Sequence, residues 1–321
     1  MNHPQPGAPH HVAEDLGHAV HDRRARVGLV QVCLAGVLWG TGGLGVLVIR
    51  DAAPLSVVTI SAWRMVIAAA VLLGALALTR QLRAASGLLR SRPGHVVTVG
   101  VCTAAYQAFY YGSVVAVGVT VSTVVSLGLA PVLVTVVESV RARARPSPGQ
   151  LAVLGLALGG LVLVSVSADS TAGGDHPVLG VAAALGSGAA YALTTLVGRS
   201  LASSTGPLVL TTASTTIGAL ALLPAVAFAG TGGGDVADPV VAGTLVYLGL
   251  MTMALAYGLL YAGLRTTPGS AAVVATLLEP VTAAVLAAVL LGERLGPVGL
   301  VGVALILLAV AGLGRREAPP G

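Results

Sequence analysis

Residues 268–297 read PGSAAVVATLLEPVTAAVLAAVLLGERLGP, and this stretch indicates the class of fold. It holds more than twenty nearly uninterrupted apolar or small residues, enough to cross a hydrocarbon layer of ~30 Å at ~1.5 Å rise per residue. Its middle contains Glu279 followed by Pro280. A carboxylate near the centre of a bilayer costs about 2.5 to 3.5 kcal/mol on insertion scales, and a proline removes a helix hydrogen bond. The stretch therefore predicts a membrane-spanning helix whose acid faces a polar interior shared with other helices.

The composition of the whole chain also indicates an integral membrane protein. Of its 321 residues 55% are hydrophobic and 9% charged, and the mean hydropathy is +0.92, which is too apolar for an ordinary soluble globule. All 17 basic residues are arginines, and all of them except Arg64 lie in short segments that flank the apolar runs. The sequence pI near 9.7 therefore reflects membrane topology, and we expect no nucleic-acid binding. Cys33 and Cys102 fall inside apolar segments without CxxC spacing, so we expect small buried residues there.

Ten apolar segments follow a polar tail, residues 1–26, which we expect to be disordered and cytoplasmic. No metal site is assigned to the histidines of this tail, and no cofactor is expected. The fold class predicted is all-α integral membrane with ten transmembrane helices. These helices are placed at residues 27–49, 55–79, 95–117, 119–140, 150–168, 178–198, 207–229, 239–263, 268–291 and 296–314.

The arginines test this count independently, because hydropathy does not depend on the loops. With the N-terminus in the cytoplasm, fourteen arginines fall in inner segments, and only Arg50 and Arg294 fall in outer ones. Arg64 lies within the second helix. This asymmetry agrees with the positive-inside rule, so we predict a multi-pass protein of the cell (plasma) membrane with both termini cytoplasmic.

The sequence also repeats itself. A shift of 152 positions places Gly36, Trp39 and Gly40 on Gly188, Tyr191 and Ala192, and a shift of 149 places Pro131 on Pro280. Each half therefore has five spans. Because five is odd, the second half must enter the membrane from the opposite side, which predicts two inverted five-helix repeats around a central site.

Several segments resemble one family. Residues 277–313, LLEPVTAAVLAAVLLGERLGPVGLVGVALILLAVAGL, resemble the C-terminal signature of EamA-type repeats in the drug/metabolite transporter superfamily. Residues 109–140 give a weaker version, and Trp39-Gly40 and Ala62-Trp63-Arg64 also fit the pattern. The first half departs from it, since Arg141, Arg143 and Arg145 lie near where the second half has Gly292-Glu293.

The resemblance implies a division into residues 27–168 as the first repeat, 169–177 as an external loop, 178–314 as the second repeat and 315–321 as a cytoplasmic tail. It also implies a secondary carrier with a central cavity between the halves, often an exporter of amino acids, other metabolites or drug-like compounds.

Glu279 is the leading candidate for a site residue. A carboxyl group within a membrane span, next to a proline that loosens its helix, is a candidate for reversible protonation coupled to movement. The alternative is a carboxylate that a neighbouring hydroxyl or arginine satisfies. Arg64, about ten residues into its helix, has three options: it pairs with Glu279, contacts a substrate carboxylate, or bonds carbonyls freed at a helix break.

Aromatic residues are the second group of candidates. Tyr106, next to Gln107, and Tyr257 are expected to line a cavity, where rings stack on a substrate, although an interfacial aromatic belt is the competing explanation. Trp39 is a further candidate for the lining, within a glycine-rich helix. Pro131 and Pro280 are candidates for gating or hinge positions.

We expect no enzyme, because the apolar core lacks GxSxG, HExxH and paired magnesium-binding aspartates. Two functions remain: a carrier that exports a small organic metabolite by alternating access, with proton coupling through Glu279 as an option, or a non-transporting sensor or assembly protein on the same ten-helix body. The partners expected are a small-molecule substrate and the lipid bilayer, and the sequence permits a homodimer.

Overall fold

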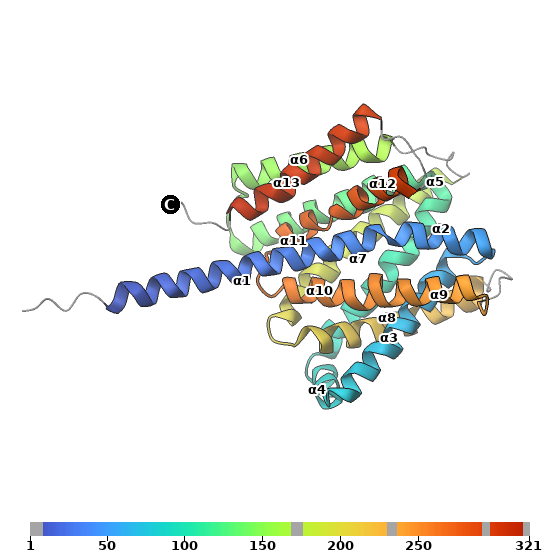
Figure 1. The fold of residues 1–321 in the computed structure, drawn as a ribbon, viewed down its shortest axis with the longest axis horizontal. Helices are drawn as coiled ribbons and strands as arrows, with labels where there is room; N and C mark the ends of the chain where they lie inside the picture. The colour runs from blue at the N-terminus through green and yellow to red at the C-terminus, as the bar shows by residue number, and fades with distance from the viewer. Residues whose placement is uncertain (1–8, 168–175, 230–235, 291–295, 317–321) are drawn as a thin grey trace, which may run out of the picture.

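The computed structural model describes residues 9–167, 176–229, 236–290 and 296–316. These ranges are all-helical, and the long helices run side by side in one bundle (Figure 1). The N-terminal end of α1 and the C-terminal end of α13 lie at the same end of the bundle, as an even number of spans requires (Figure 1). The described part of the chain therefore has the predicted fold class.

The helices of the first half are α1 (Pro9–Gly40), α2 (Gly42–Ala52), α3 (Val57–Leu78), α4 (Leu82–Ser91), α5 (Pro93–Ala142) and α6 (Pro148–Ser167). Those of the second half are α7 (Pro177–Ala202), α8 (Pro207–Ala229), α9 (Pro239–Tyr247), the π-helix η1 (Leu248–Leu255), α10 (Ala256–Gly263), α11 (Gly269–Ala275), α12 (Leu278–Leu290) and α13 (Pro297–Arg316). Among the described residues nine helices, counted across short breaks, are long and apolar enough to cross a membrane.

The 50 residues of α5 form two spans rather than one. Gly118, at φ 83° and ψ 166°, is the non-helical residue inside α5. The Tyr110 hydroxyl lies 2.9 Å from that of Thr123, whereas residues 13 apart in a straight helix are ~20 Å apart. The chain therefore doubles back at Gly118, where glycine tolerates the positive φ, and the predicted helices 95–117 and 119–140 are its two arms. The count of ten spans follows.

Two predicted spans are broken near their middle. The span expected at 27–49 is interrupted at Thr41, between α1 and α2. The span expected at 268–291 is interrupted at Thr276 and Leu277, between α11 and α12. Pro280 has no N–H to donate to the Thr276 carbonyl, which instead accepts the Glu279 N–H at 2.9 Å. The Glu-Pro pair thus accounts for the second break.

Two stretches differ from their predicted state. Helix α1 begins at Pro9, so residues 9–26 are helical where a disordered tail was expected. Extension of a helix that is already nucleated fixes only one residue per added hydrogen bond, so the first span can continue as a helix into this polar segment.

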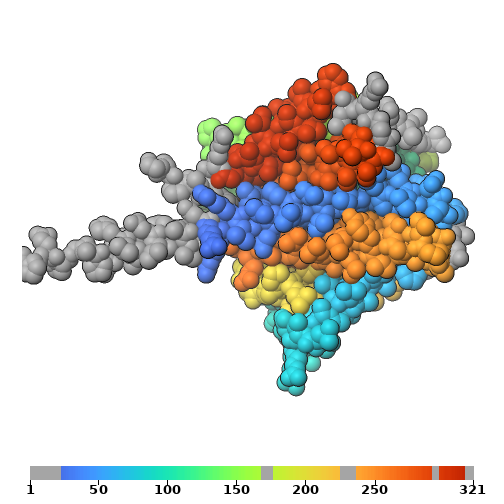
Figure 2. All heavy atoms as spheres, viewed as in Figure 1, coloured from blue at the N-terminus to red at the C-terminus, as the bar shows by residue number. Residues whose placement is uncertain are grey.

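Helix α4 lies in the segment that was predicted to be a loop, and it projects beside the end of α3 (Figure 2). Its Leu88 is buried against the bundle while Leu82 and Leu89 are exposed.

The contacts between the halves repeat at the two offsets found in the sequence. A Cβ atom on Gly28 of α1 would meet Thr266, just after α10. A Cβ atom on Gly180 of α7 would meet Val117, at the end of the first arm of α5. Gly180 follows Gly28 by 152 positions, and Thr266 follows Val117 by 149.

A second pair of contacts obeys the same offsets. A Cβ atom on Gly36 would lie 3.3 Å from the Ala275 carbonyl oxygen, and one on Gly188 would lie 2.7 Å from that of Ser126. In both pairs a helix of one half packs on a helix of the other half. An exchange of the two halves reproduces these contacts, as a pseudo-two-fold relation requires.

Candidate functional site

A cavity of about 550 Å³ lies between the two halves of the bundle. It extends from the broken helices at mid-bundle to the end where α2 and α6 finish and α5 bends. The candidates from the sequence that line it are Trp39, Arg64, Tyr106, Gln107, Tyr257, Glu279 and Pro280. Further lining residues are Leu47, Arg50, Tyr110, Tyr111, Val119, Thr120, Leu127, Ser165, Ser167, Tyr191, Met253 and Ala287.

The mouth of the cavity is at the end where α2 finishes. Leu47, Arg50 and Val119 line the cavity and are exposed. Because Arg50 carries a charge, this end meets water rather than acyl chains. Helices α3 and α7 begin at this end, so the finishing ends of α3, α5 and α7 all lie opposite the mouth.

Glu279 lies at the inner part of this cavity. It is the second residue of α12, directly after the helix break, and its side chain lines the cavity. Among the described residues the carboxylate has no hydrogen bond and no ion pair within 4.0 Å. The alternative role, a carboxylate that a neighbouring hydroxyl or arginine satisfies, would need a hydrogen bond or ion pair that the described residues do not make. The carboxylate is therefore free to meet a solute or a proton.

Arg64 is buried in α3, and its guanidinium contacts the π-helical segment of the opposite half. Nη2 donates to the Thr252 hydroxyl at 2.8 Å, and Nη1 lies 3.4 Å from the Tyr111 hydroxyl. Nε is buried and has no partner. Of the three options for Arg64, the structure has neither an ion pair with Glu279 nor a bond to a freed carbonyl among the described residues. Arg64 itself lines the cavity, and its Nε is the one nitrogen of its guanidinium without a hydrogen-bond partner in the described part of the chain.

The aromatic residues form one continuous chain of rings. Trp39 contacts Tyr257 edge-on, with ring centroids 5.1 Å apart, and Tyr191 at 6.3 Å. Tyr191 continues to Tyr106 at 5.2 Å, and Tyr106 stacks on Tyr110 at 6.3 Å. These rings come from α1, α5, α7 and α10, so they meet in the interior rather than at the two membrane surfaces. This arrangement is a cavity wall and not an interfacial belt.

Three buried polar atoms on the lining residues have no hydrogen-bond partner: Arg64 Nε, Gln107 Oε1 and Ser165 Oγ. The Gln107 amide donates only to the Met65 sulfur, at 3.4 Å. An unmade hydrogen bond on a buried group costs about 1 to 3 kcal/mol. The described residues that line the cavity therefore carry one unsatisfied donor, one unsatisfied acceptor and one unsatisfied hydroxyl.

Pro131 is the one candidate that lies away from the cavity. It is buried inside the second arm of α5, which continues through it, and the non-helical residue of α5 is Gly118 instead. Two residues of the site, Tyr191 and Thr252, were not predicted from the sequence. Tyr191 and Thr252 lie in apolar spans without a motif, although Tyr191 is the repeat counterpart of Trp39. Thr252 also accepts the Trp39 indole N–H at its carbonyl, at 2.8 Å.

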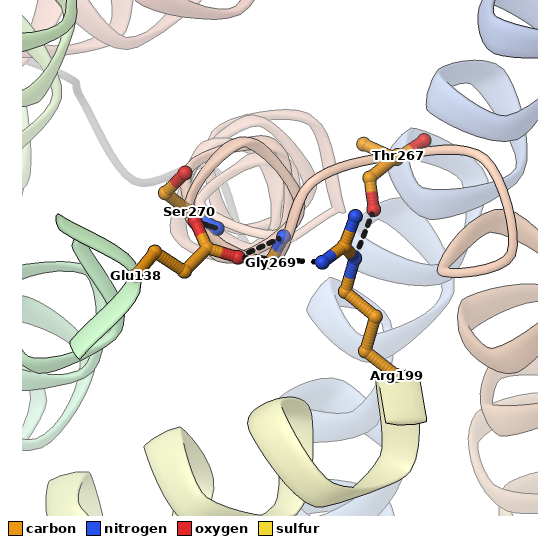
Figure 3. Close-up of polar contacts among 5 residues, drawn as sticks. All are labelled: Glu138, Arg199, Thr267, Gly269 and Ser270. Atoms are coloured by element: carbon orange, nitrogen blue, oxygen red, sulfur yellow. Dashed lines mark hydrogen bonds and ion pairs between the residues drawn. The ribbon is translucent and has the colours of Figure 1, made fainter. Parts of the chain in front are cut away.

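Polar contacts join α5, α7 and the start of α11 at the end of the bundle opposite the mouth. Figure 3 shows these contacts. The Glu138 carboxylate, near the end of α5, accepts the backbone N–H groups of Gly269 at 2.9 Å and Ser270 at 3.1 Å. Arg199, near the end of α7, donates through Nε to the Thr267 carbonyl at 3.2 Å. Its Nη1 lies 3.9 Å from Glu138 Oε1. Both side chains thus hold the start of α11.

In the parts of the chain that the structure describes, no group of three His, Cys, Asp or Glu side chains lies close enough to hold a metal ion. Glu293, which the repeat comparison singled out, lies outside the described residues.

Comparison with known proteins gives three findings. The model of the EamA-like transporter family matches twice, at residues 26–166 and 178–315. An uncharacterized transporter of Bacillus subtilis strain 168, YwfM, is 31% identical over 280 residues, which cover 87% of this chain and 90% of the relative. A protein of known crystal structure superposes with a TM-score of 0.73 at 21% identity, over 90% of this chain and 98% of that one. This last likeness shows a shared fold.

Proposed function

We propose that this chain, which belongs to the EamA-like transporter family, exports a small organic metabolite by alternating access. The family lies within the drug/metabolite transporter superfamily, and its members are membrane transporters and not enzymes. The observation that carries this proposal is the cavity between the halves, which has its mouth at one end of the bundle and stops at mid-bundle. The Glu138 and Arg199 contacts lie at the other end of the bundle. Amino acids and drug-like solutes are the substrate classes proposed. A cavity of about 550 Å³ accommodates a solute of that size.

Two inverted repeats, residues 27–168 and 178–314, are the proposed machinery for alternating access. The contacts that recur at offsets of 152 and 149 positions support such an arrangement. If the halves exchange their conformations, the closed end opens and the mouth closes around the same central site. Pro280, at the break between α11 and α12, is the proposed hinge of this exchange, and Pro131 is its proposed counterpart.

Substrate contact is proposed for Arg64, Tyr106, Gln107, Tyr257 and Trp39, and coupling for Glu279. The support is that Arg64 and Gln107 carry unpartnered polar atoms and that Glu279 makes no ion pair within 4.0 Å in the described part of the chain. A carboxyl group that is neutral in one orientation and charged in the other would exchange protons for solute.

The arginine asymmetry supports a plasma-membrane protein with both termini cytoplasmic. The cavity mouth, at the end where α2 finishes, then faces outward. The loop 169–177 is external and residues 315–321 form a cytoplasmic tail in this topology.

Purified protein in liposomes tests the proposal. We expect accelerated flux of at least one solute from a panel of amino acids and drug-like compounds, with and without an imposed pH gradient. A metabolite-resistance screen in cells that overproduce the protein selects the panel. Ligand binding without flux would instead favour the sensor or assembly role.

A further inference from the structure

Glu138 and Arg199, called the latch below, join three helices at the closed end. Glu138 belongs to the first half, while Arg199 and the start of α11 belong to the second. Each Glu138 oxygen accepts one of the backbone N–H groups that begin α11, and Arg199 holds the carbonyl of Thr267 just before them. No cavity-lining residue lies at this end.

The latch acts on α11, the short helix that precedes the break before Glu279. Helix α11 has only seven residues and stops at the break before α12. It is therefore a short rigid piece between the latch at one end and the coupling acid at the other. When the latch releases α11, the piece is free to tilt away from α5, and the cavity would open toward the latch.

The two repeat offsets identify the positions at the mouth that correspond to the latch. Glu138 corresponds to Ala287, 149 positions later, and Arg199 corresponds to Leu47, 152 positions earlier. Gly269, whose N–H the latch holds, corresponds to Thr120. Ala287, Leu47 and Thr120 all line the cavity. Where the closed end has a carboxylate and a guanidinium, the mouth has a methyl group and an isobutyl group.

We propose that Glu138 and Arg199 are positioning residues that hold the end opposite the mouth closed at rest, and that the lack of such a pair at Ala287 and Leu47 keeps the mouth open. In an inverted repeat built from identical halves the two orientations would have equal energy. A polar pair at one end, with leucine and alanine at the corresponding positions of the other end, removes that equality. The inference rests on the proposed alternating access. It further states which of the two orientations the protein prefers when no solute is bound.

Distances between spin labels on the full-length protein test this directly. One label pair, Val140→Cys with Arg265→Cys, spans the closed end, and another, Asp51→Cys with Val119→Cys, spans the mouth. Both pairs are placed on a background in which Cys33 and Cys102 are alanine. We expect Glu138→Ala to add a longer-distance population at the closed end and a shorter one at the mouth.

Asp238→Ala is the matched control. The Asp238 carboxylate also accepts two backbone N–H groups, those of Val240 at 2.9 Å and Val241 at 3.1 Å, at the start of α9. It caps its own helix and joins no two halves, so we expect both distance distributions to stay as in the unmodified protein. This control separates loss of a helix cap from loss of the latch.

Arg199→Gln is a second variant, which removes the Nε bond and the ion pair but leaves the Glu138 cap. We expect a shift in the same direction as for Glu138→Ala and smaller. Folding is checked by size-exclusion profile and melting temperature. Distributions of both folded variants that superpose on those of the unmodified protein would overturn the latch. Flux in liposomes is measured separately, so a latch effect without any flux would refute the transport proposal and not this one.

Discussion

The backbone of Gly40 lies against the carbonyl oxygen of Glu279. A Cβ atom on Gly40 would be 2.6 Å from that oxygen and 2.5 Å from the Thr282 Cβ. Gly40 ends α1, and Glu279 is the second residue of α12, the second part of the other broken span. The two helix breaks are thus in direct contact, and glycine is needed because no side chain fits between them.

Gly40→Ala is therefore expected to destabilise the protein. Overpacking of a tight contact costs about 1 to 3 kcal/mol, and the neighbours here are backbone and a β-branched residue rather than a flexible side chain. Thermal unfolding in detergent measures the loss. Gly43→Ala is the control, because a Cβ atom there meets nothing within 4 Å. Equal melting temperatures for the two variants would show that the breaks separate easily.

Glu279→Gln is expected to abolish flux driven by a pH gradient while the protein stays folded. The carboxylate has no hydrogen bond or ion pair among the described residues, so the amide breaks no contact of the fold, but it cannot take up or release a proton. The measurement is solute flux in liposomes with an imposed gradient, beside melting temperature. Asp238→Asn, away from the cavity, is the control. Normal gradient-driven flux in Glu279→Gln would exclude this acid as the coupling group.

The sequence predicts the spans and the place of the central acid because both depend on local hydropathy. The turn between residues 117 and 119 is found for the same reason, with Gly118 at the bend. The contacts between residues that are far apart in the sequence are not predicted. Glu138 binds Gly269 across 131 positions, and no periodicity or motif encodes that distance. The breaks were also missed, since the Glu-Pro pair alone permits a kink or a break, and packing against Gly40 decides between them.

Tyr106→Phe and Tyr257→Phe are expected to change solute preference with little change in stability. Neither hydroxyl has a hydrogen bond to the described residues. Both rings pack in the aromatic chain: the Tyr257 ring centroid lies 5.1 Å from that of Trp39, and the Tyr106 ring centroid lies 5.2 Å from that of Tyr191. Phenylalanine keeps the ring and removes the polar atom offered to the cavity. Competition by a panel of unlabelled solutes measures preference. Tyr191→Phe is the contrast, because its hydroxyl bonds Thr276 at 2.8 Å and its loss should lower the melting temperature. An unchanged preference in both cavity variants would assign these rings to packing.

Thr252→Val is expected to weaken binding of the solute through Arg64. The Thr252 hydroxyl accepts the Arg64 Nη2 hydrogen at 2.8 Å and donates to the Leu248 carbonyl at 2.7 Å. Valine keeps the shape and leaves the guanidinium with one hydrogen bond fewer, and a hydrogen bond to a charged group contributes about 1.5 to 3 kcal/mol. The apparent KM for flux should rise more than the maximal rate falls. Thr244→Val, whose hydroxyl bonds only its own helix at Val240, is the control. A rise of KM equal to that of the control would contradict a positioning role for Thr252.

A latch built at the mouth is expected to reverse the resting orientation. Leu47→Arg together with Ala287→Glu places a guanidinium and a carboxylate at the positions that correspond to Arg199 and Glu138, both of which line the cavity. If the orientations differ in energy mainly through these pairs, the double variant should shorten the label distance across the mouth and slow solute flux. Leu47→Arg with Ala287→Gln adds the same bulk without the anion and should leave the mouth open. Closure by that control to the same extent would mean that side-chain volume, not the polar pair, sets the orientation.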